Sequence, residues 1–119
     1  MYSDLIIDLS KNPLNKRIIK QATNTHSGAN ITCGDHVRMY VLLNKDNKIS
    51  DCSFEGEGCA ICIATSSLIT EYAKNKSVAE VLSWTEQNIF EFLEAEIGAS
   101  RIKCALLPLE VIHGALKEK

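Results

Sequence analysis

The sequence predicts an α+β fold in which a small antiparallel sheet is packed by an N-terminal helix and C-terminal helices. Two observations support this class. Every second residue over 37–43 is apolar, and a second short apolar run over 49–54 follows a cluster of turn residues, which is typical of a β-hairpin. After Cys59 the apolar side chains recur at nearly helical spacing as far as Leu116.

Length and composition limit the classes of protein to consider. A chain of 119 residues that is 45% hydrophobic can bury one core, so residues 1–119 are predicted to form a single domain. The formal charge is −2 and the basic residues are scattered, so we expect no nucleic acid partner. Acids stand where a signal peptide has bases, and no apolar run could span a bilayer. We therefore expect a cytoplasmic protein with no membrane partner.

The first segment is predicted to be a short amphipathic helix from Tyr2 to about Leu9. Ser3 can cap this helix, and Asn12-Pro13 ends it. Residues 18–31 then mix polar and small side chains, which indicates a weak strand or a loop.

The predicted hairpin brings three candidate ligands together. Its strands are Val37–Leu43 and Ile49–Phe54. Cys33 and Asp35 lead into the first strand, and the second strand leaves through two glycines to Cys59. Because the two ends of an antiparallel hairpin meet, we expect these three residues to be neighbours.

The rest of the chain is predicted to be helical. One helix covers Ala60–Lys74, a short one is capped by Ser77, and a third ends at Gly98. Proline is tolerated in the first turn of a helix and disruptive deeper inside, so Pro108 indicates that the last helix begins close to Cys104.

Three of the five cysteines lie in contexts that favour a thiolate. Gly34 leaves the backbone open beside Cys33, while Cys59 and Cys104 fall at predicted helix starts, where the partial positive charge favours an anion. An odd number of cysteines in a reducing compartment indicates metal, redox or packing roles. With the carboxylate of Asp35, the three thiolates form a recognisable ligand set for a borderline-soft metal.

Three segments of the chain resemble the signature of a known family. They are Asn30–Asp35, Phe54–Ile61 and Arg101–Ala105. Together with the opening residues, they resemble the iron-sulfur cluster assembly scaffold family of the IscU, SufU and NifU N-terminal domain type over nearly the whole chain. The resemblance implies an α+β domain with a sheet of about three strands. The ligands that it implies for a nascent iron-sulfur cluster or a zinc ion are Cys33, Asp35, Cys59 and Cys104.

The resemblance implies one of two functions. A scaffold, which is not an enzyme, accepts sulfur from a cysteine desulfurase, binds iron, assembles a labile cluster and passes it to recipient or carrier proteins. Asp35 is the labile ligand in that case, because a carboxylate binds a cluster less tightly than a thiolate does. A SufU-like sulfurtransferase instead holds zinc at the same ligands and receives a persulfide on Cys33.

We favour the scaffold, with the iron-sulfur cluster as a transient cofactor and zinc as an alternative or adventitious occupant. The stretch from Cys59 to Cys104 is too short for the extra segment of the SufU class. Lys103, however, stands where many scaffolds have a histidine, and the Arg-x-Lys-Cys pattern resembles SufU. We expect a monomer or a transient homodimer.

Two cysteines lie outside this ligand set. Cys52 alternates with Phe54 and is predicted to be a core residue. Cys59 and Cys62 form a C-x-x-C motif at a helix start, but a thioredoxin-like fold needs a βαβ context that the antiparallel hairpin does not provide. Cys62 therefore either packs as a small residue or lies beside the metal, where it could resolve a persulfide or replace a ligand.

Overall fold

The computed structural model describes residues 3–117 and contains one antiparallel sheet, in the order β1-β2-β3. The strands are β1 (Asn24–Asn30), β2 (Asp35–Leu43) and β3 (Ile49–Glu57). The helices are α1 (Asp4–Lys11), α2 (Ala60–Ala73), α3 (Val78–Leu82), α4 (Glu86–Leu93) and α5 (Ile102–Lys117), with a 3₁₀ turn η1 (Ala99–Arg101) directly before α5. These elements confirm the predicted α+β class and its three strands.

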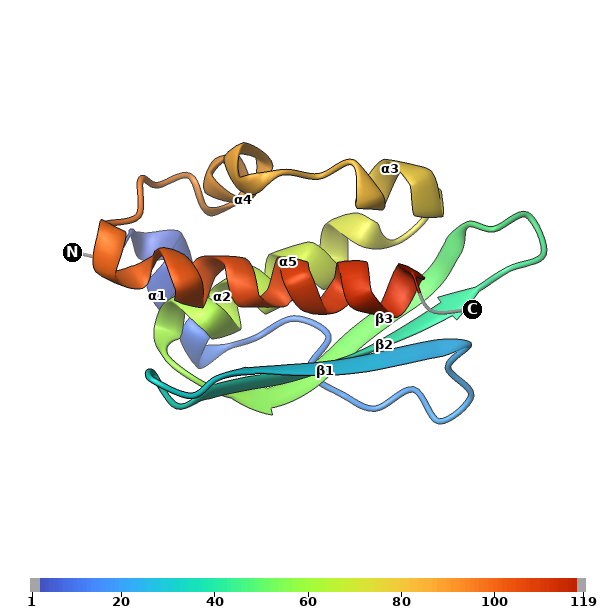
Figure 1. Cartoon of the computed structure of the whole chain (residues 1–119), viewed down its shortest axis with the longest axis horizontal. Coiled ribbons are helices and arrows are strands. Elements are labelled where there is room, and N and C mark those ends of the chain that lie inside the picture. Colours follow the sequence, from blue (N-terminus) through green and yellow to red (C-terminus); the bar gives the residue numbers. More distant parts are fainter. Residues whose placement is uncertain (1–2, 118–119) are drawn as a thin grey trace.

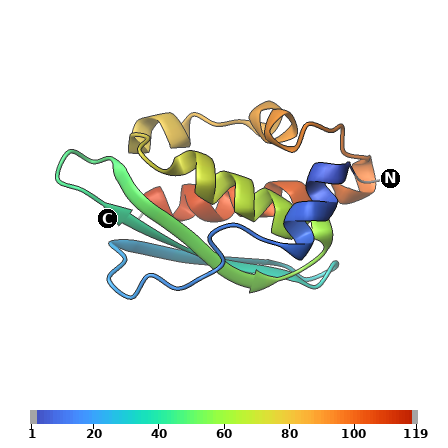
Figure 2. The same ribbon diagram turned by 180° about the vertical axis from the view of Figure 1, so that it is seen from behind.

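The helices cover one face of the sheet. Helices α2 and α5 run side by side across it, and α3 and α4 form a further layer over them (Figure 1). Helix α1 packs against α2 (Figure 2). The inward-facing side chains of the two longer strands are almost completely buried; they are Val37, Met39, Val41, Cys52 and Phe54. These side chains pack against α2 and α5 and form the core. Their size sets the distance between the two helices and the sheet.

The N-terminal helix is close to its prediction. Ser3 caps α1, since its hydroxyl accepts the backbone N–H of Ile6 at 3.3 Å, and Ile6 and Leu9 face the core. The helix continues to Lys11, two residues beyond the predicted end. The predicted start at Tyr2 lies outside the described residues.

The segment predicted as a weak strand or a loop contains strand β1. Its inward positions carry small or polar side chains instead of the usual apolar ones, because α5 passes very close to them. A Cβ atom on Gly28 would lie 2.8 Å from Val111, and one on Gly114 would lie 2.4 Å from the ring of His26. Because small and polar residues occupy the positions of β1 where α5 packs closely, its sequence lacks the alternation of apolar residues that predicts a strand.

Of the two helix boundaries predicted near the C-terminus, one differs in the structure and one is confirmed. Helix α4 ends at Leu93, because Glu94 adopts a left-handed conformation with φ of 55° that caps it, so the predicted end at Gly98 was wrong. Helix α5 begins at Ile102, which confirms a start close to Cys104. Pro108 lies in the second turn of α5, where its missing N–H leaves the carbonyl of Cys104 without the usual helical donor.

The candidate ligands come from three places that meet at one end of the sheet. The β1–β2 turn, the junction between β3 and α2, and the start of α5 all lie at the left in Figure 1, and Figure 2 shows the same grouping from behind. Within residues 3–117, no helix combines the length and the apolar content that crossing a bilayer requires.

Candidate metal centre

Asp35 lies at the base of the candidate site. It is the first residue of β2, pairs with Asn30 of β1, and is only 1% exposed. Its Oδ1 accepts the backbone N–H of Cys59 at 2.9 Å, while its Oδ2 is buried and has no hydrogen-bond partner among the described residues. A buried carboxylate oxygen without a partner is costly. A bound cation would offset that cost.

Cys33 lies above Asp35 on the exposed turn between β1 and β2. The turn is tight, because the N–H of Cys33 donates to the carbonyl of Asn30 at 3.1 Å. Gly34 completes the turn with φ of +74°, a conformation that favours glycine. The chain thus reverses within a few residues and returns to the buried carboxylate.

Cys104 approaches from the opposite side, in the first turn of α5, and is fully buried. The ligand atoms of Cys33, Asp35 and Cys104 all lie within 4.8 Å of one another. Thiolates at about 2.3 Å from a tetrahedral zinc lie about 3.8 Å apart, so these groups need to close by at most about 1 Å. The three groups can therefore share one metal ion after small side-chain movements.

Cys59 stands at the edge of this group. It is the N-cap residue of α2, is half-buried, and binds Asp35 through its backbone. Its thiol lies close enough to Cys104 to raise the pKa of that thiol. The structure thus brings three predicted ligands into one group and places the fourth beside them. We refer to Cys33, Asp35, Cys59 and Cys104 as the thiol end of the sheet.

Burial raises the pKa of the Cys104 thiol well above its ordinary value, and Asp35, Cys59 and Cys33 raise it further. The expectation that the helix start would favour a thiolate at Cys104 is therefore wrong for the protein without metal, because burial outweighs the helix terminus. A metal that binds Cys104 must displace its proton.

Gly58 is a residue of this site that motif reasoning left without a role. A Cβ atom at position 58 would lie 2.5 Å from Oδ1 of Asp35 and 3.1 Å from its carboxyl carbon. Glycine therefore lets the chain pass directly over the carboxylate, so that the next backbone N–H can reach it. The only signal in the sequence is the glycine that directly precedes Cys59.

Lys103 directly precedes Cys104 but has a different environment. Its side chain is exposed and lines a small pocket of about 250 Å³ with Asn30, Leu107 and Glu110. Asn30 is also notable because its Nδ2 atom is buried without a hydrogen-bond partner among the described residues.

The other two cysteines have different surroundings. Cys52 lies fully buried in the core, as predicted, and burial raises the pKa of its thiol to about 12. Cys62, in the first turn of α2, is also fully buried. Burial raises the pKa of the Cys62 thiol, and the nearby Asp35 and Cys59 raise it further. Cys62 is therefore next to the thiol end, while Cys52 is not.

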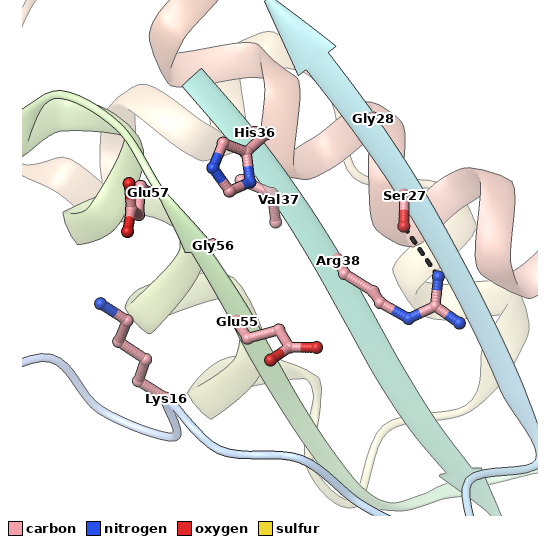
Figure 3. A pocket seen from close by; sticks show the side chains of 9 residues that line it. All are labelled: Lys16, Ser27, Gly28, His36, Val37, Arg38, Glu55, Gly56 and Glu57. Carbon is pink, nitrogen blue, oxygen red and sulfur yellow. Dashed lines mark hydrogen bonds between the residues drawn. The ribbon is translucent and has the colours of Figure 1, made fainter. Parts of the chain in front are cut away.

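A pocket of about 520 Å³ lies on the outer face of the sheet, away from the helices (Figure 3). Its lining contains none of the four candidate ligands. The side chains that project into it mix both charges; they are Lys16, Ser27, His36, Arg38, Glu55 and Glu57. This mixture has no clear preference for one ligand.

The fold and the site define a small α+β domain with a candidate metal-binding group of Cys33, Asp35 and Cys104, and with Cys59 beside it. Residues 1–118 match the family described as NifU-like N terminal domain. The chain belongs to this family of iron-sulfur cluster assembly proteins.

Named relatives and solved structures agree with this membership. The chain is 36% identical to the iron-sulfur cluster assembly scaffold protein IscU 1 of Archaeoglobus fulgidus, over 98% of this chain and 74% of that protein. It is 33% identical to the zinc-dependent sulfurtransferase SufU of Bacillus subtilis, over 100% of this chain and 92% of that protein. The crystal structure of a putative scaffold protein for the SUF system from Fervidobacterium islandicum AW-1 superposes with a TM-score of 0.85 at 31% identity, covering 98% and 96% of the two chains.

A more distant structure shares the fold alone. The N-terminal part of a nitrogen-fixing NifU-like protein from Brucella abortus superposes with a TM-score of 0.79 at 16% identity, covering 97% of this chain and 91% of that one.

Proposed function

We propose that this protein is a scaffold on which an iron-sulfur cluster is assembled and from which the cluster is passed on. The observation that carries the proposal is the state of Asp35. One oxygen of this buried carboxylate is held by the N–H of Cys59, and the other has no partner among the described residues while two cysteine sulfurs lie within 4.8 Å. Such a group is suited to a cationic cargo with soft ligands.

The four residues have distinct roles in this proposal. Cys33 is exposed, so its thiolate can attack the outer sulfur of a persulfide on a cysteine desulfurase. The sulfur moves to Cys33, and the thiolate of the desulfurase leaves. Cys104 and Cys59 supply the inner sulfurs that bind iron. Asp35 supplies Oδ2 as the fourth ligand.

Asp35 also accounts for release of the cargo. A carboxylate binds an iron-sulfur cluster less tightly than a thiolate does, so this bond breaks first. Its Oδ1 accepts the N–H of Cys59, which leaves Oδ2 as the oxygen that is free to bind the cargo. A recipient protein can then complete the ligand shell of the cluster as it leaves.

A zinc-dependent sulfurtransferase is the second candidate, since the donor set also fits zinc and one relative carries that name. In that function Cys33 leaves zinc to receive the persulfide. The alignment with that relative extends over 139 positions, so at least 20 of them face a gap in this chain of 119 residues. The missing length favours the scaffold.

We further infer that residues 1–119 act as one domain that works with a cysteine desulfurase and with cluster recipients. The five cysteines are free thiols, which suits the reducing conditions of the cytoplasm.

Anaerobic reconstitution with iron, sulfide and a reductant tests this function. We expect a coloured protein that contains iron and acid-labile sulfide, and we expect Cys33→Ala, Cys59→Ala and Cys104→Ala to stay colourless. Asp35→Ala should gain colour and lose it more slowly to an apo acceptor protein than the parent does.

Two results would contradict the scaffold. Tight stoichiometric zinc that iron cannot replace, together with persulfide on Cys33, would favour the sulfurtransferase. A protein that binds neither iron nor zinc would exclude both functions.

A further inference from the structure

We propose that Cys59 and Cys62 form a dithiol that reduces a bound persulfide to sulfide within the protein. A cluster contains sulfide, whereas a desulfurase delivers sulfur at the oxidation level of a persulfide, so two electrons must be added. The inference rests on the proposed function, because the persulfide is its substrate. It assigns a reaction to Cys62, which is not one of the four candidate metal ligands.

The first support is the geometry of the pair. Cys59 is the N-cap of α2, and Cys62 lies in the first turn of the same helix. Residues three apart on a helix have Cα atoms about 5 Å apart. That distance lies inside the range in which a disulfide forms without backbone movement. The two thiols are therefore positioned to form a disulfide.

The two thiols also differ in exposure in the way that such a reaction requires. Cys59 is half-buried and borders the site, so incoming sulfur can reach it. Cys62 is fully buried below it and is inaccessible to an external persulfide. Sulfur can therefore load on Cys59 while Cys62 remains a free thiol that attacks it.

A second observation is the hydroxyl of Ser66, which lies one turn beyond Cys62 on the same face of α2. Ser66 is fully buried, and its Oγ has no hydrogen-bond partner among the described residues. An unsatisfied hydroxyl in the interior is costly, and this one can donate to a thiolate on Cys62. A hydrogen bond donated by Ser66 would thus stabilise the attacking form of the Cys62 thiol.

The reaction balances without an external oxidant or reductant. The sulfur of Cys62 attacks the inner sulfur of the Cys59 persulfide, a sulfur–sulfur bond forms between the two residues, and the outer sulfur leaves. In this step the sulfur of Cys62 is oxidised by one electron and the outer sulfur of the persulfide is reduced by one electron to sulfide, while the sulfur of Cys59 keeps the oxidation level it already has in the persulfide. The proton of Cys62 leaves with it as hydrogen sulfide. An external dithiol then reduces the disulfide and restores Cys59 as a ligand.

Persulfide loading without iron or a desulfurase tests the reaction. The full chain is treated with sodium tetrasulfide, freed of excess reagent, and incubated anaerobically without a thiol reductant. For the parent we expect release of sulfide together with a Cys59–Cys62 disulfide, seen as a mass about 2 Da below the reduced form of the peptide that contains both cysteines. For Cys62→Ser we expect a persulfide that persists, about 32 Da heavier than the reduced chain, and at least about tenfold slower release of sulfide.

Control variants separate the reaction from general effects. Cys52→Ser removes a buried core thiol that lies outside the Cys59–Cys62 motif and should behave like the parent, while Ser66→Ala should slow sulfide release without abolishing it. Mapping the disulfide in the parent needs no variant, so it remains informative if Cys62→Ser does not fold.

Equal sulfide release by Cys62→Ser and the parent, a disulfide between other cysteines, or failure of Cys59 to acquire a persulfide would each overturn the inference. A chain that forms the disulfide and releases sulfide, but binds neither iron nor zinc, would overturn the proposed function and leave the dithiol reaction intact.

Discussion

Cys52 and Cys104 are both fully buried thiols, yet they belong to regions with opposite properties. Cys52 lies in the middle of the edge strand β3, where it pairs with Val41 of β2 and packs in the core. Cys104 lies at the thiol end, where a carboxylate oxygen and a second sulfur come within 4.8 Å of it.

The comparison teaches that burial alone does not assign a cysteine its role. In both places burial raises the pKa of the thiol. Among residues 3–117, Cys52 belongs to no group of three side chains that could hold a metal ion, so it stays a small apolar side chain. The thiol end offers ligands from three chain segments, so a metal can replace the proton of Cys104.

The largest difference should appear when each thiol is removed. Cys104→Ala should weaken zinc binding by at least about 100-fold, because a ligand is lost and not merely an outer partner. Cys52→Ala should leave zinc affinity unchanged. Both should lower the free energy of unfolding by about 1 kcal/mol, since each leaves a small cavity. Competition with a chromogenic chelator and urea unfolding measure the two quantities, and equal zinc affinities would remove the distinction between the regions.

The next effect concerns how Asp35 is held. Gly58→Ala should weaken zinc binding by about 10- to 100-fold, because the added Cβ displaces the carboxylate and breaks its bond to Cys59. Gly98→Ala is the matched control, since a Cβ at Gly98 meets nothing within 4 Å. In an Asp35→Ala background the Gly58 substitution should have no further effect. An undiminished effect there would show that Gly58 acts by another route.

A smaller effect concerns the contribution of Cys52 to stability at alkaline pH. The pKa of Cys52 is about 12 in the folded protein against 9.0 ordinarily, chiefly because of burial. The unfolded state therefore loses the Cys52 proton at a lower pH than the folded state does. The contribution of Cys52 to the free energy of unfolding should be fully present below pH 9 and should fall by about 1.4 kcal/mol for each pH unit above it. Cys52→Ala should flatten this part of the curve. Parallel curves for the two proteins would argue against a Cys52 contribution.

The smallest effect lies on the edge strand β3, at the residue directly before Cys52 and away from the thiol end. The guanidinium of Arg17 donates to both oxygens of Asp51, at 3.1 and 2.8 Å, and holds the pKa of that carboxyl below its ordinary value. The pair therefore adds stability above the ordinary carboxyl pKa, and this is lost as pH falls through the lowered one. Both side chains are partly exposed, so Asp51→Asn should cost only about 0.2–1 kcal/mol at neutral pH. Asp46→Asn, in the exposed turn 44–48, is the control in the same acid titration.

Local patterns predicted the hairpin, the order of the helices and the approach of Cys33, Asp35 and Cys59. These features depend on alternation, turn residues and caps, which are properties of neighbouring residues. The sequence predicted strand β1 less clearly than the hairpin. His26 and Gly28 fit the close approach of α5 and bury little apolar surface of their own, so they do not give an alternating apolar pattern. That approach involves residues far away in the chain.

The site shows the same limit. The residue types at Cys33, Asp35, Cys59 and Cys104 predict soft ligands, but burial of Cys104 and the unpartnered Oδ2 of Asp35 arise only when α5 covers the end of the sheet. The contact of Gly58 with the carboxylate likewise depends on the path of the backbone. Tertiary packing, not local propensity, determines these details.

The separation of Cys33 and Cys104 along the chain has a thermodynamic consequence. A cargo bound to both closes a long loop of the polypeptide and ties the last helix to the first hairpin. Binding to the folded chain alone raises its resistance to unfolding in proportion to the logarithm of cargo concentration over its dissociation constant. A recipient that removes the cargo therefore also removes a cross-link, and the free energy that held α5 against the sheet falls at the moment of transfer.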